Sequence, residues 1–336
     1  MVEPVLAGKT LPSSQADGGE EPQVLPVVVV IATYQRQALL ARALRSVACQ
    51  TVRPAQVLVV DDGSRDGTAE LARSFGVEVI EKARNEGLSA ARDDGIQAAR
   101  PGTIWVALLD DDDEWLPHHL STLWSWRGAH VLVSGTAAVL GPSVSTHGAS
   151  SLRGEVVRSP ARLLFPENSV TTSAAMVRRD VLTDVGGFDK SLRYAEDLDA
   201  WLRVLERGTA ILVPEITCLY HQHGGQLSSN RDAMRAANTQ IMNKYESRSW
   251  ISPRLRQRVA VVDTWDHLQA CRAARDWDHA WSDGAWLARP SRLADLSRLW
   301  AFRRKTRRFS LDHGWPPGHG DEGPHERAQP ASVNPQ

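Results

Sequence analysis

The chain has 336 residues, of which 42% are hydrophobic and 24% are charged, as in an ordinary globular protein. This composition excludes a disordered, collagen-like or fibrous protein. The 39 basic and 40 acidic residues leave a formal net charge of -1, which argues against general binding of nucleic acid. Three cysteines without CxxC spacing are too few for a disulfide framework and favour a reducing compartment.

Neither a membrane span nor a signal peptide is predicted. No segment reaches the roughly 18 consecutive apolar residues that a membrane helix needs. The N-terminal stretch carries Glu3, Asp17, Glu20 and Glu21 where a signal peptide has basic residues before an apolar core. We therefore expect a cytoplasmic protein.

Apolar runs alternate with helical patterns from about residue 25. Val27–Ala32 is a continuous, mostly β-branched run, as in a strand that is buried on both faces. The elements predicted after it are a helix over Leu39–Val47, a strand Val57–Val60, a helix Thr68–Phe75, a strand Val77–Ile80, a helix Leu88–Ala99 and a strand Ile104–Leu109. This alternation predicts an α/β fold with a mostly parallel sheet.

The pattern changes near Asn230, after which helical periods follow one another without a strand signal. The predicted helices are Ala233–Tyr245, Leu255–Ala274, Trp277–Leu287 and Leu293–Phe302. We predict an α/β domain over residues 25–228 and a helical region over residues 229–309. Residues 1–24 and 310–336, which lack periodicity, are predicted to be disordered tails.

Polar residues follow the predicted strands, where ligands bind in open α/β sheets. Thr33, Tyr34 and Arg36 follow the first strand, and no GxGxxG stands there, so a dinucleotide-binding fold is not predicted. Asp61 follows the second strand, and Asp66 is a candidate N-cap of the next helix.

Five acidic residues, Asp110–Glu114, follow directly on a buried strand. Their mutual repulsion at a crevice rim requires a counter-charge, and Mg2+ or Mn2+ bound by one or two carboxylates would supply it. The alternative is a solvated acidic run.

These stretches resemble the family 2 glycosyltransferases, which have the GT-A fold, a Rossmann-like, mostly parallel sheet flanked by helices. The resemblance runs from about Val27 to Ser229. In chain order, it is carried by VVVVIATYQR, VLVVDDGSRDGT, NEGLSAARDDGI, WVALLDDDDEW, VGGFDKSLRYAEDLDAWLRV and YHQHGGQLS. It implies an inverting transferase that uses a nucleoside-diphosphate sugar and a divalent metal, Mn2+ or Mg2+.

The resemblance also implies roles for single residues. Those implied to bind the nucleotide sugar are Thr33, Tyr34, Arg36, Asp61, Gly87, Arg92, Asp110 and Asp111. In the DxD-like motif, Asp110 would contact the ribose and Asp112 the metal, but Asp113 leaves this register ambiguous by one residue. Asp93 departs from the family, which usually has Asn after the arginine.

Glu196 and Asp197 begin a predicted helix, where acids ordinarily complement the helix dipole. The resemblance instead implies a catalytic pair downstream of Gly186-Gly187-Phe188. Asp197 would be the general base, with Glu196 assisting in contacts to the acceptor or the sugar.

His221 and His223 follow the apolar run Ile216–Tyr220, a candidate strand, and on a strand their spacing would place both on one face. A lone histidine is more often structural, but the resemblance implies that His223 completes the metal site.

Other features leave alternatives open. The QxxRW motif of processive members is absent, which favours transfer of one sugar by a soluble enzyme. The acceptor is a saccharide, a lipid-linked sugar, a natural product or a peptide. The segment Gly141–Pro160 is either a flap over the acceptor or a surface loop. A non-catalytic scaffold that binds nucleotide sugars and a nucleotidyltransferase are the alternative functions.

Six of the 12 tryptophans lie between Trp250 and Trp300. We expect most of them to form the core of the helical region, and an aromatic acceptor platform is the alternative. Arg289–Arg308 holds eight basic residues and one acid, which indicates either a solvated helix face or peripheral contact with the inner face of an anionic membrane. Nothing in the sequence indicates the oligomeric state.

Overall fold

A computed structural model describes residues 22–312, apart from 142–144, 149–153 and 166–167, and without the side chains of 228, 231, 274 and 302–312. The strands are β1 (Val24–Thr33), β2 (Arg53–Asp61), β3 (Glu78–Glu81), β4 (Trp105–Leu108), β5 (Glu114–Trp115), β6 (Leu132–Leu140), β7 (Ser145–His147), β8 (Glu155–Val157), β9 (Ala175–Arg178) and β10 (Ala210–His221). The α-helices are α1 (Gln37–Ala48), α2 (Thr68–Ser74), α3 (Leu88–Gln97), α4 (His119–Trp126), α5 (Ala161–Leu164), α6 (Arg179–Asp184), α7 (Glu196–Leu205), α8 (Arg231–Lys244), α9 (Pro253–Ala274), α10 (Trp277–Leu287) and α11 (Pro290–Asp312), and the short 3-10 helices are η1 (Thr172–Ala174) and η2 (Leu227–Ser229).

The strands form one sheet in the order β3-β2-β1-β4-β9-β6-β10-β5, with β7 paired to β6 and β8 to β10. The pairs β1–β2, β1–β4, β2–β3 and β6–β10 are parallel. β5, β7, β8 and β9 run antiparallel to their neighbours. The predicted α/β fold with a mostly parallel central sheet and flanking helices is confirmed.

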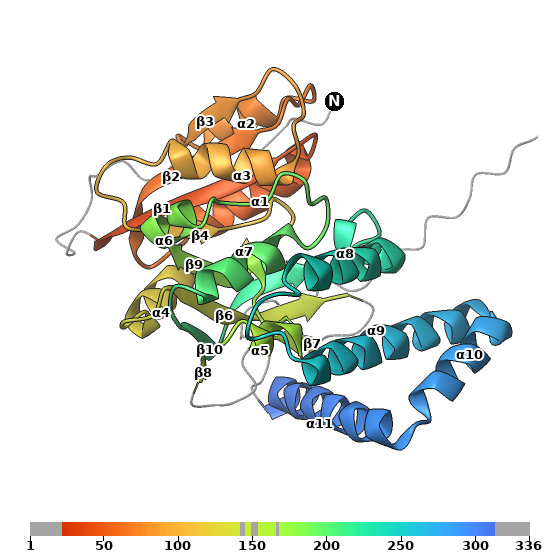
Figure 1. The fold of residues 1–336 in the computed structure, drawn as a ribbon. Coiled ribbons are helices and arrows are strands. Elements are labelled where there is room, and N and C mark those ends of the chain that lie inside the picture. The colour runs from red at the N-terminus through yellow and green to blue at the C-terminus, as the bar shows by residue number, and fades with distance from the viewer. Residues whose placement is uncertain (1–21, 142–144, 149–153, 166–167, 313–336) are drawn as a thin grey trace, which may run out of the picture.

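Helices cover both faces of this sheet, which explains the continuous apolar run of β1. Side chains alternate between faces along a strand, so Val28 and Val30 enter one buried cluster while Val29 and Ile31 enter another. Residues of α3, α6 and α7 complete the first cluster (Figure 1), and residues of α1, α2 and α4 complete the second.

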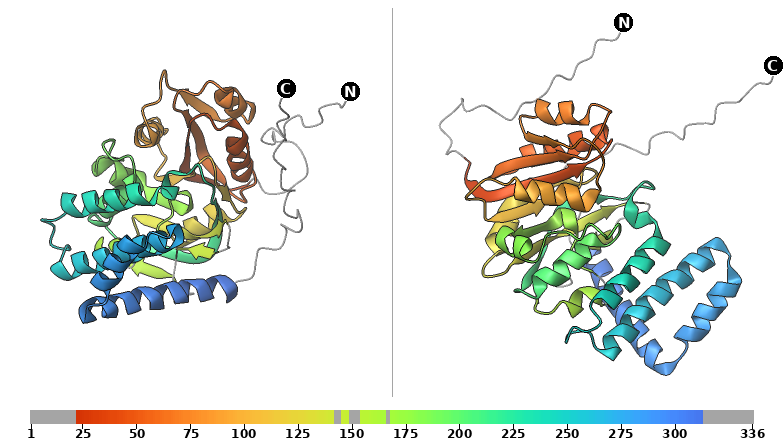
Figure 2. Two further views of the ribbon diagram at one scale, coloured as in Figure 1. Left: turned by 90° about the vertical axis from the view of Figure 1, so that its right-hand side faces the viewer. Right: turned by 45° about the horizontal axis from the view of Figure 1, so that its top comes forward.

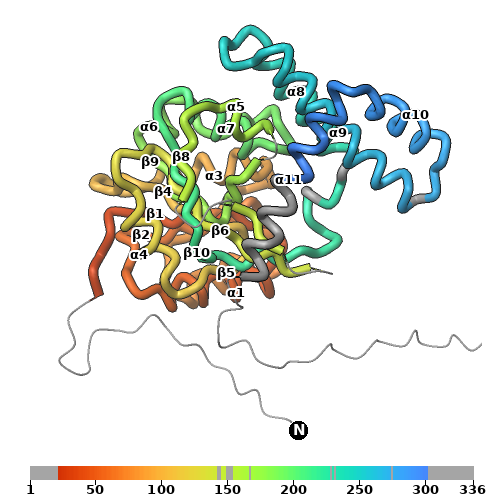
Figure 3. Tube along the Cα trace, turned by 90° about the horizontal axis from the view of Figure 1, so that it is seen from below, coloured from red at the N-terminus to blue at the C-terminus, as the bar shows by residue number. Residues whose placement is uncertain are grey.

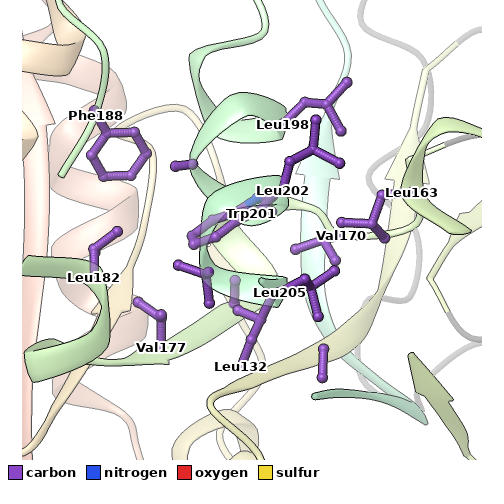
Figure 4. Close-up of a cluster of buried hydrophobic side chains, with 14 of the residues drawn as sticks. Leu132, Leu163, Val170, Val177, Leu182, Phe188, Leu198, Trp201, Leu202 and Leu205 are labelled. Carbon is purple, nitrogen blue, oxygen red and sulfur yellow. The ribbon is translucent and has the colours of Figure 1, made fainter. Parts of the chain in front are cut away.

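Helix α7 is anchored by its apolar face. Leu198, Leu202 and Leu205 recur at helical spacing and are buried with Trp201 over the sheet (Figure 4). The ring of Phe188 meets Trp201 edge-on at a centroid distance of 6.1 Å. This packing fixes the first turn of α7, which carries the predicted catalytic pair.

The core continues into the C-terminal helices. Ile241 and Tyr245 of α8 and Leu255 of α9 belong to the same cluster as Trp201, and the Tyr245 hydroxyl donates to Asp199 at 2.7 Å. The predicted division between residues 228 and 229 therefore falls within one continuous core and stays a prediction. Beyond this contact, α9 and α10 project away from the β1–β3 end of the sheet, with α11 alongside α9 (Figures 2 and 3).

Three local predictions need correction. Gly67, at φ 85°, is the N-cap residue of α2, and this left-handed residue leaves Asp66 one position earlier, where it accepts the Thr68 N–H at 3.2 Å. The surface-loop alternative fails for the described part of Gly141–Pro160, because β7 pairs with β6 and β8 pairs with β10. The alternative of a flap over the acceptor stays a prediction. Its residues 142–144 and 149–153 lie outside the described residues, as do 1–21 and 313–336 of the predicted tails 1–24 and 310–336. The tail prediction is wrong at its inner ends, because β1 begins at Val24 and α11 continues to Asp312.

The prediction of a tryptophan core in the helical region is wrong for Trp277, Trp281 and Trp300, which are 58%, 78% and 53% exposed. The buried residues of α10 are Ala280 and Leu287 instead, while Trp277 and Trp281 of the same helix are exposed.

Candidate active site

The site lies where β1, β2 and β4 end at the same edge of the sheet. These strands are parallel, so their carboxyl ends bring Thr33, Asp61 and the acidic run after Leu109 to one place. The first turn of α7 reaches the same edge, because Arg92 of α3 bonds both Glu196 and the acidic run.

The four aspartates of the run have different surroundings. Asp113 is fully buried, where its carboxylate accepts hydrogen bonds from the Ser173 hydroxyl and from the backbone N–H of His221 at 3.0 Å. Burial raises the pKa of Asp113 well above its ordinary value. This aspartate therefore joins β10 to the strand-end loops, and the other three aspartates remain for a ligand.

Asp111 and Asp112 share one arginine. Arg36 Nη1 donates to Asp111 Oδ1 at 3.0 Å and to Asp112 Oδ2 at 2.9 Å. Thr33 Oγ1 donates to Asp111 Oδ2 at 2.7 Å, and burial raises the pKa of Asp111 to about 6 despite this bond and the arginine. His223 Nε2 lies 2.9 Å from Asp112 Oδ2, so the fold brings together the two predicted metal ligands, which are 111 residues apart in the sequence.

Arg92 joins three elements of the site. Its guanidinium is buried and donates to Asp110 Oδ1 at 2.6 Å and to Glu196 Oε1 at 2.8 Å, while its carbon lies 5.3 Å from the ring centroid of Phe188. Asp110 and Glu196 raise the pKa of Arg92 although burial opposes this, so the arginine stays charged. A fixed positive charge thus stands between the DxD-like motif and the acidic pair.

The two acids of the pair are held differently. Glu196 is buried, and burial together with the charge of Asp197 raises its pKa, against the opposing charge of Arg92. Asp197 is only partly buried, and it accepts from Thr172 Oγ1 at 3.0 Å and from the Leu198 N–H at 2.7 Å. Of the two carboxylates, Asp197 is therefore the one with solvent access and without a cation bonded to it among the described residues.

Three residues that were predicted to contact the nucleotide form hydrogen bonds with other groups of the protein. Tyr34 is 41% exposed, and its hydroxyl accepts from the Gln35 amide at 3.0 Å. Asp61 is buried and accepts the Ser64 N–H at 2.9 Å. Gly87, at φ 95°, donates its N–H to Asp62 at 2.7 Å, which holds the glycine-bearing loop at the strand edge.

Positive charge at the acidic run comes from two arginines, Arg36 and Arg92, whereas the sequence argument gave this role to a metal ion alone. Sequence reasoning also missed Thr172 and Ser173, which bond Asp197 and Asp113. The only signal for them is a short polar stretch before the apolar strand β9.

The chain is similar to known proteins in both sequence and fold. Residues 28–186 match the model of the family described as glycosyl transferase family 2. The chain is 29% identical over 239 residues to N-acetylglucosaminyl-diphospho-decaprenol L-rhamnosyltransferase of Mycobacterium tuberculosis, covering 59% of this chain and 76% of that protein. It is 32% identical over 199 residues to the glycosyltransferase AglE of Haloferax volcanii, covering 56% of this chain and 64% of that protein.

Two solved structures share the fold. TarS 1–349 of S. aureus in complex with UDP-GlcNAc superposes with a TM-score of 0.57 at 15% identity, covering 82% of this chain and 81% of that chain. The mannosyltransferase PcManGT of Pyrobaculum calidifontis in complex with GDP-Man and Mn2+ gives a TM-score of 0.54 at 19% identity, covering 88% and 90%.

Within the part of the chain that the structure describes, no helix has the length and apolar character to cross a membrane. The family match spans the strands β1 to β9, whose ends carry the arginine–aspartate networks described above. Over residues 28–186, the chain is similar to glycosyl transferase family 2.

Proposed function

We propose that the protein transfers one sugar from a nucleoside-diphosphate sugar to an acceptor nucleophile, with inversion at the anomeric carbon and Asp197 as general base. The observation that carries the proposal is the contrast within the acidic pair: Glu196 is bonded to the buried Arg92, whereas Asp197 is partly exposed beside it. The relatives support the donor class, since TarS was solved with UDP-GlcNAc and PcManGT with GDP-Man.

The donor would lie along the strand edge. The residues proposed to bind it are Thr33, Tyr34, Arg36, Asp61, Gly87, Arg92, Asp110 and Asp111. Arg36 and Arg92 provide guanidinium groups, which suit diphosphate oxygens because they bond in a planar fork. Asp110, whose carboxylate is 30% exposed, is free to accept from a ribose hydroxyl through the oxygen that Arg92 does not hold.

A divalent metal fits the pair Asp112 and His223. Their facing atoms, Oδ2 and Nε2, are 2.9 Å apart, and the carboxylate is a ligand type that suits Mg2+ or Mn2+. These two residues would hold the ion, and Arg36 would then exchange its bond to Asp112 for the donor. A metal bound there stabilises, as a Lewis acid, the charge that develops on the leaving diphosphate.

Asp197 would take the proton from the acceptor as the acceptor attacks. A hydroxyl is a poor nucleophile until its proton is removed, and a positioned carboxylate typically contributes about 10²–10⁴-fold in rate. The bond from Thr172 orients this carboxylate. Glu196, held by Arg92, would contact the sugar or the acceptor.

The acceptor is a saccharide, a lipid-linked sugar, a natural product or a peptide. The name of the Mycobacterium tuberculosis relative contains a diphospho-decaprenol carrier, which supports a test of lipid-linked acceptors first. The basic stretch Arg289–Arg308 would then rest on an anionic membrane. Five of its eight basic residues, Arg303 to Arg308, have side chains outside the described part, so this contact rests on sequence alone.

The test starts from the donor. The protein is screened by thermal shift against UDP-, GDP- and dTDP-sugars with Mn2+, because a bound donor raises stability by RT ln(1 + [L]/Kd). With the donor found, we expect slow release of nucleoside diphosphate. Asp197→Asn should lower turnover by about 10²–10⁴-fold without weakening donor binding. Asp184→Asn, at an exposed acid of α6, is the control and should keep full activity.

Other outcomes would overturn the proposal. Full activity of Asp197→Asn would remove the general base. Donor binding without any turnover would favour a scaffold, and exchange of pyrophosphate would favour a nucleotidyltransferase.

A further inference from the structure

A second polar cluster lies between α9 and α10, on elements that contribute no residue to the active site described above. His267 and Cys271 are four residues apart and therefore share one face of α9. Asp283 faces them from α10. Cys271 is buried, and His267 and Asp283 are 23% and 20% exposed, so the cluster lies in the contact between the two helices.

The potential ligand atoms converge. His267 Nδ1 lies 2.6 Å from Asp283 Oδ2, and Cys271 Sγ lies 3.8 Å from Nδ1 and 3.6 Å from Nε2 of the same imidazole. One nitrogen, one sulfur and one oxygen thus fall within 4.8 Å of one another.

This geometry does not suit a cysteine nucleophile with a histidine base. The sulfur is almost equally far from both ring nitrogens, whereas a proton transfer needs it in line with one of them.

The same geometry suits a tetrahedral metal. With zinc–sulfur and zinc–nitrogen bonds of about 2.3 Å and 2.0–2.1 Å, ligands at a tetrahedral angle lie about 3.5 Å apart. The 3.8 Å separation between Cys271 Sγ and His267 Nδ1, the ring nitrogen that faces Asp283, is close to this value. The histidine–carboxylate contact at 2.6 Å is shorter and would open to admit the ion.

We propose that His267, Cys271 and Asp283 bind a zinc ion that pins α10 to α9. Thiolate and imidazole are the ligands that zinc prefers over Mg2+ or Mn2+, and a water molecule would complete the tetrahedron. Zinc would replace the thiol proton, which explains why a cysteine stands beside an aspartate at this buried position.

Cobalt(II) is the probe, because it occupies tetrahedral zinc sites and gives a thiolate-to-metal charge-transfer band. The active-site pair Asp112 and His223 offers no sulfur and cannot produce this band. The metal-stripped, reduced full-length chain is titrated with Co2+. We expect a band that saturates and that zinc then abolishes. Cys49→Ser, at an exposed thiol outside the cluster, is the control and should keep the band.

Cys271→Ser should lose the band. His267→Ala and Asp283→Asn should weaken cobalt binding by at least about 100-fold, since losing a group that only orients a metal ligand already costs about 10–100-fold. If Cys271→Ser does not fold, the wild-type titration and Asp283→Asn still decide. A wild-type chain without the band, or an unchanged band in Cys271→Ser, overturns the site.

Discussion

The helices at the active site and those of the C-terminal region begin in different ways. α8, α9 and α10 begin at Asn230, Ser252 and Asp276, each of which accepts a first-turn backbone N–H with its own side chain. α3 and α7 begin at Gly87 and Ala195, which have positive φ values of 95° and 55° and no side chain that can cap. The first group is stabilised by local sequence, and the second by tertiary contacts that hold the backbone at the site.

The tryptophans of the two regions differ in the same sense. Trp115 and Trp201 are 2% and 0% exposed, because both faces of the sheet are covered, whereas Trp277 and Trp281 are 58% and 78% exposed. In the α/β part, these tryptophans therefore belong to the hydrophobic core. In the helical part, Trp277, Trp281 and Trp300 lie on the surface, so composition alone does not distinguish the two environments.

The largest expected effect tests this contrast directly. Trp201→Ala leaves a cavity under α7 and should lower the free energy of unfolding by about 3–5 kcal/mol. Trp281→Ala, the matched substitution on α10, should change it by no more than about 0.5 kcal/mol. Urea titrations of both variants measure the difference. Equal losses would mean that the exposed tryptophans are covered in solution and that the contrast fails.

Much of the α/β fold could be predicted, because strands that are buried on both faces read as continuous apolar runs, as in β1, β2 and β4. β10 was predicted only over Ile216–Tyr220. Its pairing with β6 shifts register near Ile216, after the interruption by Pro214 and Glu215. An apolar pattern cannot reveal a strand that continues through such an irregularity.

The candidate site was predicted less completely. Asp112 and His223 were paired through the family resemblance, since nothing local connects residues so far apart in the chain. Thr172 and Ser173 could not be found, because an isolated hydroxyl has no pattern and acquires a role only when η1 folds against the strand ends. The hydrogen bonds from Arg36 to both Asp111 and Asp112 likewise form only through tertiary contact, so the sequence did not predict them.

Removing the negative charge of Asp263 in α9 should give the next largest effect on stability. Burial raises the pKa of Asp263 to about 6, although a hydrogen bond from Asn238 opposes it. An aspartate in the unfolded chain has a pKa of about 3.9, so the native chain binds the proton more tightly and loses stability as the pH rises from about 4 to about 6. Asp263→Asn should therefore raise the free energy of unfolding by about 1–2 kcal/mol at pH 7 and leave it unchanged below pH 4.

Denaturant titrations at pH 4 and pH 7 measure this gain. Glu215→Gln, at an exposed acid of β10, is the control and should show no such pH-dependent gain. A constant difference between the two pH values for Asp263→Asn would contradict the assignment. A gain only at pH 7 would show that the C-terminal helices tolerate a destabilising, half-buried charge at Asp263.

The smallest effect tests the helix starts themselves. Ser252 Oγ accepts the Leu255 N–H at 3.1 Å, and Ser252→Ala should lower the free energy of unfolding by about 1 kcal/mol because this N–H then loses its partner. Ser297→Ala in α11 makes the same chemical change inside a helix, where alanine is the better helix former, and should raise stability by up to about 0.5 kcal/mol. Thermal melts of both variants give the sign. If both substitutions stabilise the chain, α9 does not depend on its cap, and its start resembles those of the active-site helices.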